Sequence, residues 1–260
     1  MVTLPEALAA ADQHAKAQSS GQSDMFGLMT SEPDDVTATF AEVPKWPENQ
    51  WLNGEKETLG LYLTGHPINQ YRSEIKHYCS GRLVDLKPTP RDGSVTAVGL
   101  VIGVRVLVNK KGRRWGIVTL DDKSARVDAR FFPDDFEKYE ELLQPDKVLV
   151  VSGSVIFDDF SDGHTITVRE AMDTIMAREK HLKRITIGLE QHWCTPENIE
   201  QLKQLMQNYG NGTCPMSIHY QQPEAEAVLD VGAMWYLVPH DQLLHELNQM
   251  FGQERVEMVF

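Results

Sequence analysis

Four basic residues crowd one short stretch of the chain. Lys110, Lys111, Arg113 and Arg114 lie in the segment NKKGRR, between two runs of β-branched residues. Such side chains can each neutralise a backbone phosphate of a nucleic acid and release a counterion, which makes binding depend steeply on salt. The stretch therefore indicates a nucleic-acid contact, and the competing interpretation is ordinary solvated charge on a hairpin loop.

A second set of candidate binding residues comes from the segment RVDARFF, in which apolar and polar side chains alternate. If the apolar set fills a core, Arg126, Arg130 and Phe132 face outward, where an aromatic ring beside two guanidinium groups can stack a base and hold its backbone. Asp128 lies on the same face and predicts weak binding. Trp115 is a further candidate, although the parity of its strand is ambiguous. The alternative for Phe132 is packing under a neighbouring element.

The pentapeptide Gln22, Ser23, Asp24, Met25 and Phe26 places two large apolar side chains next to each other outside any predicted core. A short extended peptide can insert such a pair into pockets on a partner protein. The alternative is that both side chains fold back onto the chain's own helices. The residues alone leave these two interpretations balanced.

Candidate catalytic and metal-binding groups are sparse. Asp121 and Asp122 end a predicted strand and point to opposite faces, and the loop DDFSDGH lacks the terminal Glu of a calcium loop. We interpret these acids as turn formers. Because Ser/His/Asp and Cys/His arrangements and phosphate-cradling glycine loops do not occur either, we expect no catalytic site, no cofactor and no metal in this chain.

The cysteines and histidines lack the spacing of metal ligands. Cys79, Cys194 and Cys214 are odd in number and far apart, so we expect reduced thiols and neither a disulfide framework nor a zinc site. His66 and His77 have no partner at a useful spacing. We expect them to cap helices or to lie on the surface.

The elements that must position the basic residues form a β-rich region. The segment predicts strands over 94–108, 115–120 and 126–132, a helix over 133–143, and strands over 147–157 and 165–172. Five strands with one helix between the third and fourth predict an OB-type five-stranded β-barrel, whose first hairpin loop rims the ligand face. Gly99 and Gly103 suit a sharply bent first strand. Another small barrel or a sandwich is the alternative.

A small α+β domain is predicted to follow the barrel. We expect strands over 184–189, 214–221, 226–232, 235–239 and 256–260, with helices over 196–209 and 240–251. Each helix carries one apolar face, as helices lying on a sheet do. The region is acidic, which makes nucleic acid a poor partner for it.

The barrel is preceded by helical and linker segments. Thr3 and Glu6 make a capping-box pattern for a helix over 3–18, and residues 29–50 mix acid and proline as linkers do. A second helix is expected from 53 to just before Gly65, with Leu59, Tyr62 and Leu63 as its apolar stripe.

Overall charge and hydropathy limit the functional classes. The 260 residues include 25 Lys and Arg against 38 Asp and Glu, a net charge of −13, so any nucleic-acid contact must be local. No run of about 18 apolar residues occurs, and the first ten residues lack the features of a secretion signal. We expect a cytoplasmic protein without a membrane partner.

Longer segments carry a family resemblance. The pentapeptide at 22–26 resembles the consensus by which bacterial DNA polymerases and repair proteins dock on the sliding clamp. GEKETLGLYLTGHP, TLDDKSARVDARFF and VLVVSGSVIFDDF resemble the C-terminal part of bacterial replicative DNA polymerase III alpha subunits. The resemblance extends over essentially the whole chain. It implies a non-catalytic section of a DNA-directed DNA polymerase, because the family's catalytic aspartates belong to a palm domain outside this chain.

The resemblance also implies a division of labour along the chain. Residues 1–20 would form a helix at the end of the preceding polymerase domain. Residues 21–52 would hold the clamp-binding peptide and a linker, and residues 53–93 would form a connecting helix and loop before the barrel. An OB domain at 94–176 would bind single-stranded template DNA, and 177–260 would bind the tau subunit of the clamp loader. Family members can carry a second clamp motif at the C-terminus, but Arg255 stands here where Gln is expected, so we interpret 256–260 as a strand.

Two other functional classes remain open on the sequence. An anticodon-binding OB module of an aminoacyl-tRNA synthetase would share the barrel and its base-stacking surface and would prefer RNA. A purely structural interaction domain would have no affinity for nucleic acid, which suits the acidic total charge.

Overall fold

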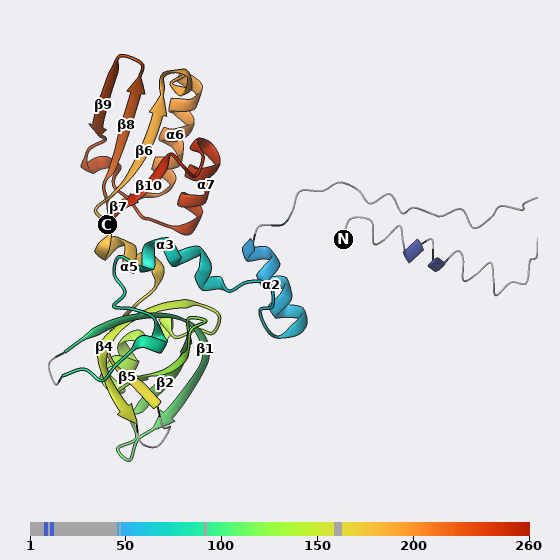
Figure 1. The fold of residues 1–260 in the computed structure, drawn as a ribbon, viewed down its shortest axis with the longest axis vertical. Coiled ribbons are helices and arrows are strands. Elements are labelled where there is room, and N and C mark those ends of the chain that lie inside the picture. Colours follow the sequence, from blue (N-terminus) through green and yellow to red (C-terminus); the bar gives the residue numbers. More distant parts are fainter. Residues whose placement is uncertain (1–7, 10, 13–45, 47, 91–92, 159–162) are drawn as a thin grey trace, which may run out of the picture.

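The computed structural model describes residues 8, 9, 11, 12, 46, 48–90, 93–158 and 163–260. It shows a β-barrel and a separate four-stranded sheet, with short helices lying between them (Figure 1). Of the helix predicted over residues 3–18, the four described residues are helical. The pentapeptide 22–26 and nearly all of the predicted linker lie outside the described residues.

Five strands close the barrel in the order β1-β2-β3-β5-β4. Neighbouring strands are antiparallel, except that β3 and β5 run parallel. One helix, α4 (Pro133–Tyr139), separates β3 from β4 along the chain. This order is that of an OB barrel, which confirms the predicted fold class. The strands are β1 (Val95–Val108), β2 (Arg114–Asp121), β3 (Arg126–Phe131), β4 (Val148–Asp158) and β5 (Gly163–Met172).

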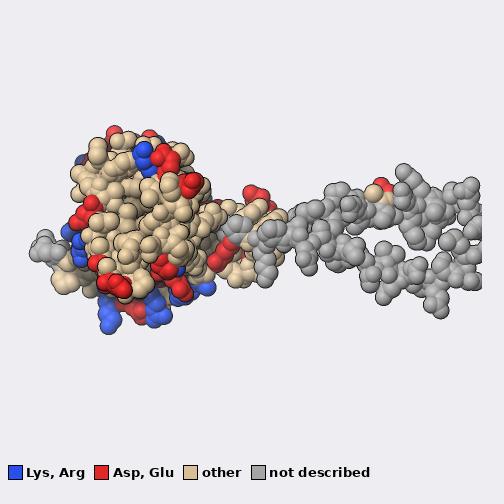
Figure 2. Space-filling model, turned by 90° about the horizontal axis from the view of Figure 1, so that it is seen from above, with Lys and Arg blue, Asp and Glu red and all other residues tan. Residues whose placement is uncertain are grey.

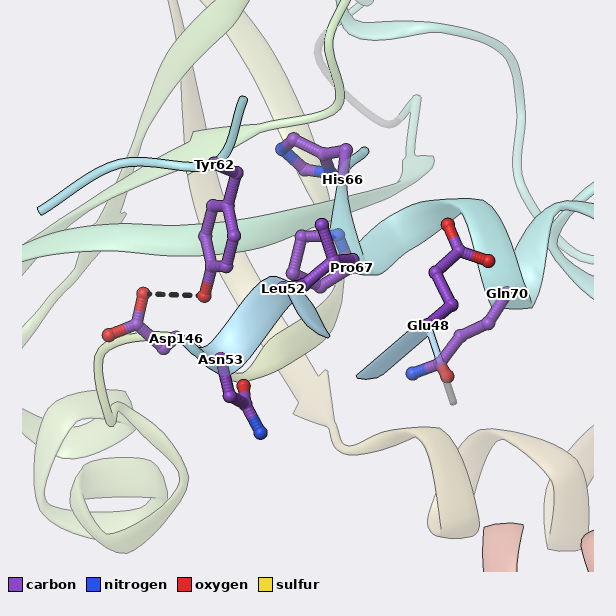
Figure 3. A pocket seen from close by; sticks show the side chains of 8 residues that line it. All are labelled: Glu48, Leu52, Asn53, Tyr62, His66, Pro67, Gln70 and Asp146. Carbon is purple, nitrogen blue, oxygen red and sulfur yellow. Dashed lines mark hydrogen bonds between the residues drawn. The ribbon is translucent and has the colours of Figure 1, made fainter. Parts of the chain in front are cut away.

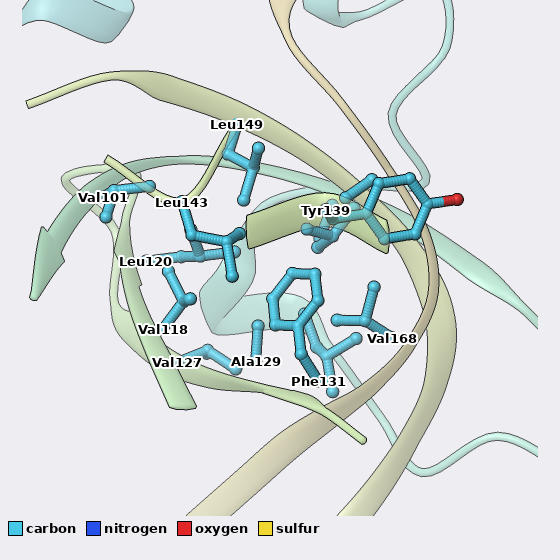
Figure 4. Close-up of a cluster of buried hydrophobic side chains, with 14 of the residues drawn as sticks. Val101, Val118, Leu120, Val127, Ala129, Phe131, Tyr139, Leu143, Leu149 and Val168 are labelled. Atoms are coloured by element: carbon cyan, nitrogen blue, oxygen red, sulfur yellow. The ribbon is translucent and has the colours of Figure 1, made fainter. Parts of the chain in front are cut away.

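Alternating side chains fill the barrel interior (Figure 4). Val118 and Leu120 on β2 and Phe131 on β3 are completely buried. Tyr139 at the end of α4 meets the ring of Phe131 edge-on, with 6.5 Å between the ring centroids. The helix between the third and fourth strands thus closes one end of the barrel and leaves the outer face of β1, β2 and β3 uncovered by it.

Glycines sit where the barrel strands bend or approach each other closely. β1 shifts register against β2 just before Gly103, and a Cβ at Gly103 would meet nothing within 4 Å. A Cβ at Gly99 would lie 2.8 Å from the Cβ of Leu120, and one at Gly153 would lie 2.0 Å from the carbonyl oxygen of Thr167. The predicted bend in the first strand is present, and the tightest contact is the one at Gly153 on β4.

The second sheet has the order β10-β6-β8-β9. Two helices, α6 (Pro196–Asn208) and α7 (Asp241–Phe251), pack their apolar faces against it, as predicted. The contacts bury Leu202, Leu205, Leu243 and Leu247 together with Ile185 and Ile187. The strands are β6 (Arg184–Glu190), β8 (Met216–Gln222), β9 (Ala225–Asp230) and β10 (Val256–Val259). The C-terminal strand predicted over 256–260 is therefore present.

The strand predicted over 235–239 is wrong. A short 3-10 helix, η5 (Ala233–Trp235), ends at the first residue of this segment, and only Leu237 bridges to the unpredicted strand β7 (Gly210–Cys214). A Cβ at Gly212 would lie 2.0 Å from the carbonyl oxygen of Leu237. The segment thus touches β7 at one close crossing, where the completely buried Leu237 side chain anchors it.

The helix predicted from residue 53 is displaced. Helix α2 (Glu48–Leu59) begins inside the predicted linker and ends where Gly60 adopts a φ of +76° and donates its N–H to the carbonyl oxygen of Lys56. The predicted apolar stripe is wrong, because the side chains of Leu59 and Leu63 are 52% and 67% exposed. Tyr62 is half-buried.

Short helices join the barrel to the second sheet. These are η1 (Pro67–Tyr71), α3 (Arg72–Ile75) and α5 (Thr174–His181), whereas η2 (Leu83–Asp85) packs its Leu83 into the barrel core. The predicted boundary between residues 176 and 177 falls inside α5. One apolar cluster spans these helices and the barrel wall, and its buried members are Ile68, Tyr71, Tyr78, Val98, Leu100, Val148, Val150, Met172 and Ala177. The ring of Phe260 packs against this cluster and stacks on His77, with 4.7 Å between centroids.

A buried ion-pair network lies beside this cluster. The Arg178 Nε and Nη2 groups donate to the two carboxylate oxygens of Glu74 at 2.6 and 2.7 Å. Arg178 Nη1 donates to the carbonyl oxygen of Pro239 at 2.9 Å and lies 2.7 Å from Asp241 Oδ1. Tyr71 donates its hydroxyl to Asp241 Oδ2 at 2.7 Å. We call Tyr71, Glu74, Arg178 and Asp241 the joint network, because it ties η1 and α3 to α5 and α7.

Candidate nucleic-acid interface

The predicted parity of β3 is confirmed. Val127, Ala129 and Phe131 are buried, so Arg126 and Arg130 point outward from the barrel. Beyond the end of the strand, the Phe132 side chain is 51% exposed and is not packed under a neighbouring element. The structure also resolves the parity of β2, on which the inward set is Gly116, Val118 and Leu120. Trp115 therefore faces outward with Ile117.

The strand register arranges the outward residues in rows across the barrel. Arg105 on β1 pairs with Ile117 on β2, which pairs with Arg130 on β3. In the neighbouring row, Leu107 lies opposite Trp115. We call this outward side of β1, β2 and β3 the barrel face. It has an apolar row, Leu107 and Trp115, beside a row that begins with the guanidinium group of Arg105 and ends with that of Arg130. Bases can stack on the first and phosphates can approach the second.

Arg105 and Leu107 belong to this face but are absent from the predicted set. The uniformly apolar run of β1 conceals which of its side chains point inward. The hairpin itself carried the missing signal, since pairing the strands on either side of the NKKGRR loop sets Leu107 opposite Trp115. The far edge of the barrel adds a further unpredicted aromatic, Phe157, whose 48% exposed ring meets His164 edge-on.

The loop between β1 and β2 is shaped to present its lysines. Asn109 Oδ1 accepts the backbone N–H groups of Lys111 and Arg113 at 2.9 and 3.0 Å, and Gly112 adopts a φ of +76°. Lys110 and Lys111 are exposed. Within the described part of the chain, no carboxylate forms an ion pair with either lysine.

The predicted arginines, in contrast, are paired with carboxylates. Arg113 Nη2 lies 2.6 Å from Asp134 Oδ1, and Arg114 pairs with Glu140. The hydrogen bond and charge of Asp134 raise the pKa of Arg113. Arg126 and Arg130 have carboxylate partners of their own, Asp121 at 2.9 Å and Asp158 at 2.5 Å. The positive charge of all four predicted arginines is therefore already countered. They do not share one face, because Arg126 and Arg130 point outward on β3, whereas Arg114 has the strand parity of the inward residue Gly116 on β2.

The acids at the end of β2 form a turn, in line with their interpretation from the sequence. Asp122 Oδ1 accepts the backbone N–H groups of Ser124 and Ala125, and Asp122 Oδ2 accepts that of Leu83. Burial raises the pKa of the Asp122 carboxyl, but the hydrogen bonds that it accepts from the Ser124 hydroxyl and from these backbone N–H groups outweigh burial and lower it below its usual value. The described residues contain no group of three or more His, Cys, Asp or Glu that is arranged to hold a metal ion.

A pocket of about 160 Å³ lies between α2 and the barrel (Figure 3). Tyr62 donates its hydroxyl to Asp146 across it at 3.1 Å, and His66 lines its wall. His66 caps η1, because its Nδ1 accepts the N–H of Ile68 at 3.2 Å. Burial lowers the pKa of His66. These contacts fasten the connecting segment to the barrel, and the pocket carries no arrangement of catalytic groups.

The charge on the surface is mixed in sign. In the view of Figure 2, which looks at the molecule from the end where β8 and β9 lie in Figure 1, Lys and Arg side chains alternate with Asp and Glu and with uncharged surface. Among the described residues, no helix is long and apolar enough to cross a membrane.

Comparison with known proteins places this architecture. A family model described as "OB-fold nucleic acid binding domain" matches residues 95–173, and one described as "DNA polymerase III subunit alpha, C-terminal domain" matches residues 201–252. The DNA polymerase III subunit alpha of Escherichia coli K12 is 47% identical over 100% of this chain. The chain matches the C-terminal region of DNA polymerase III alpha. The counterparts from Haemophilus influenzae and Pseudomonas aeruginosa are 45% and 38% identical over 99% and 98% of the chain.

The match to the polymerase alpha subunits covers nearly all of this chain but only part of each relative. The chain spans 22% of the length of these curated relatives. Among solved structures, an OBody bound to hen egg-white lysozyme is 21% identical, with a TM-score of 0.30, over 37% of this chain and 94% of that one. RecG bound to a three-way DNA junction is 19% identical, with a TM-score of 0.29, over 52% of this chain and 19% of that one. At these values neither structure bears on function.

Proposed function

We propose that the chain is the section of a replicative DNA polymerase that holds the enzyme on its template through several separate contacts. The observation that supports this most strongly is the match to DNA polymerase III alpha along the whole chain, together with a closed OB barrel at residues 95–172. In this proposal residues 22–26 bind the sliding clamp, the barrel face binds single-stranded template, and residues 177–260 bind the clamp-loader tau subunit. Linked weak contacts raise one another's effective concentration.

The DNA contact rests on the barrel face and the neighbouring loop. Lys110 and Lys111 supply exposed charge, and Trp115 and Phe132 supply rings for stacking. Each stacked base contributes about 1–3 kcal/mol and tolerates any sequence, as template binding requires. Because all four predicted arginines are paired with acids, we expect weak binding. The test compares the affinity of the full chain for a single-stranded DNA oligonucleotide with its affinity for a tRNA. Preference for the DNA supports this function, and preference for the tRNA supports a synthetase anticodon module.

The tau contact rests on the C-terminal sheet and its helices. Residues 184–260 contain three Lys and Arg against ten Asp and Glu, so a basic segment of a partner would be favoured and nucleic acid disfavoured. The match of residues 201–252 to the C-terminal domain of polymerase alpha supports a place for this region at the end of a polymerase chain. Titration of the full chain with a purified tau fragment tests this contact.

The clamp contact rests on the sequence of the pentapeptide. Burying a Met and a Phe contributes about 1.5–3 kcal/mol each, so Met25→Ala combined with Phe26→Ala should weaken clamp binding by at least about 100-fold. The matched control is Met29→Ala combined with Phe40→Ala, which removes the same two side-chain types from the same segment. Binding of the purified clamp to the full chain is the measurement. Equal losses in both variants, or none in the first, would refute the assignment.

A further inference from the structure

The guanidinium groups of the barrel face are covered by carboxylates of that same face. Arg105 Nη2 donates to Asp128 Oδ2 at 2.8 Å, and Thr119 donates its hydroxyl to Asp128 Oδ1 at 2.7 Å. Arg130 Nη2 donates to Asp158 Oδ2 at 2.5 Å. Thr119 on β2 lies directly opposite Asp128 on β3 in the β2–β3 ladder, so its hydrogen bond holds the Asp128 carboxylate between these two strands.

We propose that Asp128 and Asp158 occupy on Arg105 and Arg130 the positions that phosphate oxygens take when nucleic acid binds. The proposal rests on the proposed DNA-binding function of this face. Carboxylate and phosphate present similar pairs of acceptor oxygens to a guanidinium group, so one can replace the other without moving the arginine. Binding is then an exchange, in which each carboxylate leaves its arginine as a phosphate arrives.

The exchange has an electrostatic consequence. The side chain of Asp128 is 30% exposed and that of Asp158 is 15% exposed, so neither displaced carboxylate moves far from the incoming phosphate. Like charges at such short range repel each other, which reduces the net gain from each arginine contact. The barrel face therefore holds its arginines in a binding-ready geometry and at the same time keeps the affinity low. Low affinity suits a surface that must release the template at every step.

A different role for Asp128 makes the opposite prediction. If Asp128 only positions Arg105 for phosphate, its loss leaves the guanidinium group mobile and weakens binding. If it competes with phosphate, its loss frees one positive charge and strengthens binding. Asp128→Asn distinguishes the two, because the amide keeps the shape of the carboxylate and can still accept from Thr119 while its charge is removed.

The experiment measures binding of a fluorescein-labelled single-stranded oligothymidylate to the full chain by anisotropy at several salt concentrations. Asp128→Asn should bind at least about fivefold more tightly than wild type at low salt, and its plot of log affinity against log salt should steepen by about 0.7, the value for one added phosphate contact on a single strand. Asp158→Asn should act in the same direction. The matched control is Glu170→Gln on β5, which removes the same charge from a carboxylate paired with Lys180 at 2.6 Å.

The outcomes separate this inference from the proposed function. The exchange is supported if Asp128→Asn binds the oligonucleotide more tightly with a steeper salt slope and Glu170→Gln shows no such change. The same holds if wild type itself binds too weakly to measure. Wild-type binding that Asp128→Asn leaves unchanged or weakens overturns the exchange alone. Absence of binding by wild type and both aspartate variants, with unchanged melting temperatures, overturns both.

Discussion

Arg178 on α5 and Glu74 on α3 form a two-pronged ion pair between residues 104 positions apart, and both side chains are almost completely buried. Burial raises the pKa of Glu74, and the paired charge of Arg178 opposes that rise. With Asp241 and Tyr71 completing the network, four separate elements, η1, α3, α5 and α7, meet at one point. The barrel and the C-terminal sheet are thereby held at a fixed joint.

Breaking the joint network should destabilise the protein strongly. Arg178→Met leaves Glu74 buried without its partner, and we expect a loss of about 3–5 kcal/mol in the free energy of unfolding. The double variant with Glu74→Gln should lose less than the sum of the single changes, because it removes both charges. Urea unfolding measures these differences. As a control, Glu170→Gln breaks the exposed pair with Lys180 and should cost less than about 1 kcal/mol.

The glycine at the β4 bulge should tolerate no side chain. Gly153→Ala places a Cβ 2.0 Å from a backbone carbonyl oxygen, so the strands must separate, and we expect a loss of at least about 2 kcal/mol. Gly103→Ala introduces the same methyl group into open space on β1 and should change stability by less than about 1 kcal/mol. Thermal unfolding of the two variants makes the comparison. Similar losses would contradict the role assigned to Gly153.

The cap at His66 should make stability depend on pH. Burial lowers the pKa of His66 below its ordinary 6.5, although Asp121 opposes this, and the neutral ring accepts the N–H of Ile68. A group whose pKa is lower in the folded state stabilises the protein above its unfolded pKa, and this contribution is lost as the pH falls below 6.5. His66→Asn keeps an acceptor at the cap but does not titrate. Its urea midpoint should therefore fall less than that of wild type on acidification, and parallel curves would refute the prediction.

The two halves of the basic loop should behave differently. Lys110→Glu with Lys111→Glu should weaken single-stranded DNA binding and flatten the salt slope by about 0.7 for each phosphate that is no longer neutralised. Their side chains are free of ion pairs within the described structure, so stability should stay near that of wild type. Arg113→Glu with Arg114→Glu places new acids against Asp134 and Glu140 and should lower stability as well. Equal effects of both variants on unfolding would contradict this division.

Most of the barrel and part of its outward face could be predicted from the sequence. Alternation in RVDARFF correctly set Arg126, Arg130 and Phe132 on the outside, because strand parity is a local property. It could not identify the partners of these arginines. Asp158 and Asp121 come from other strands, and ion pairs between separate elements leave no periodic pattern in the chain.

The predictions fail where single residues from distant segments meet. The α2 stripe was wrong because the helix stops at Gly60, before the predicted apolar positions complete a turn. The strand over 235–239 was wrong because its apolar residues anchor one crossing at Leu237 and do not pair along a neighbour. The joint network draws one residue from each of four helices, so no window of sequence reveals it.

The stack of Phe260 on His77 has a consequence for the order of events during folding. Pairings between residues so far apart close very long loops, which costs chain entropy before any packing energy is gained. The barrel and the C-terminal sheet can each assemble from nearer segments, so we expect them to form first as independent units. During synthesis on a ribosome, the stack on His77 can therefore form only after Phe260 has emerged.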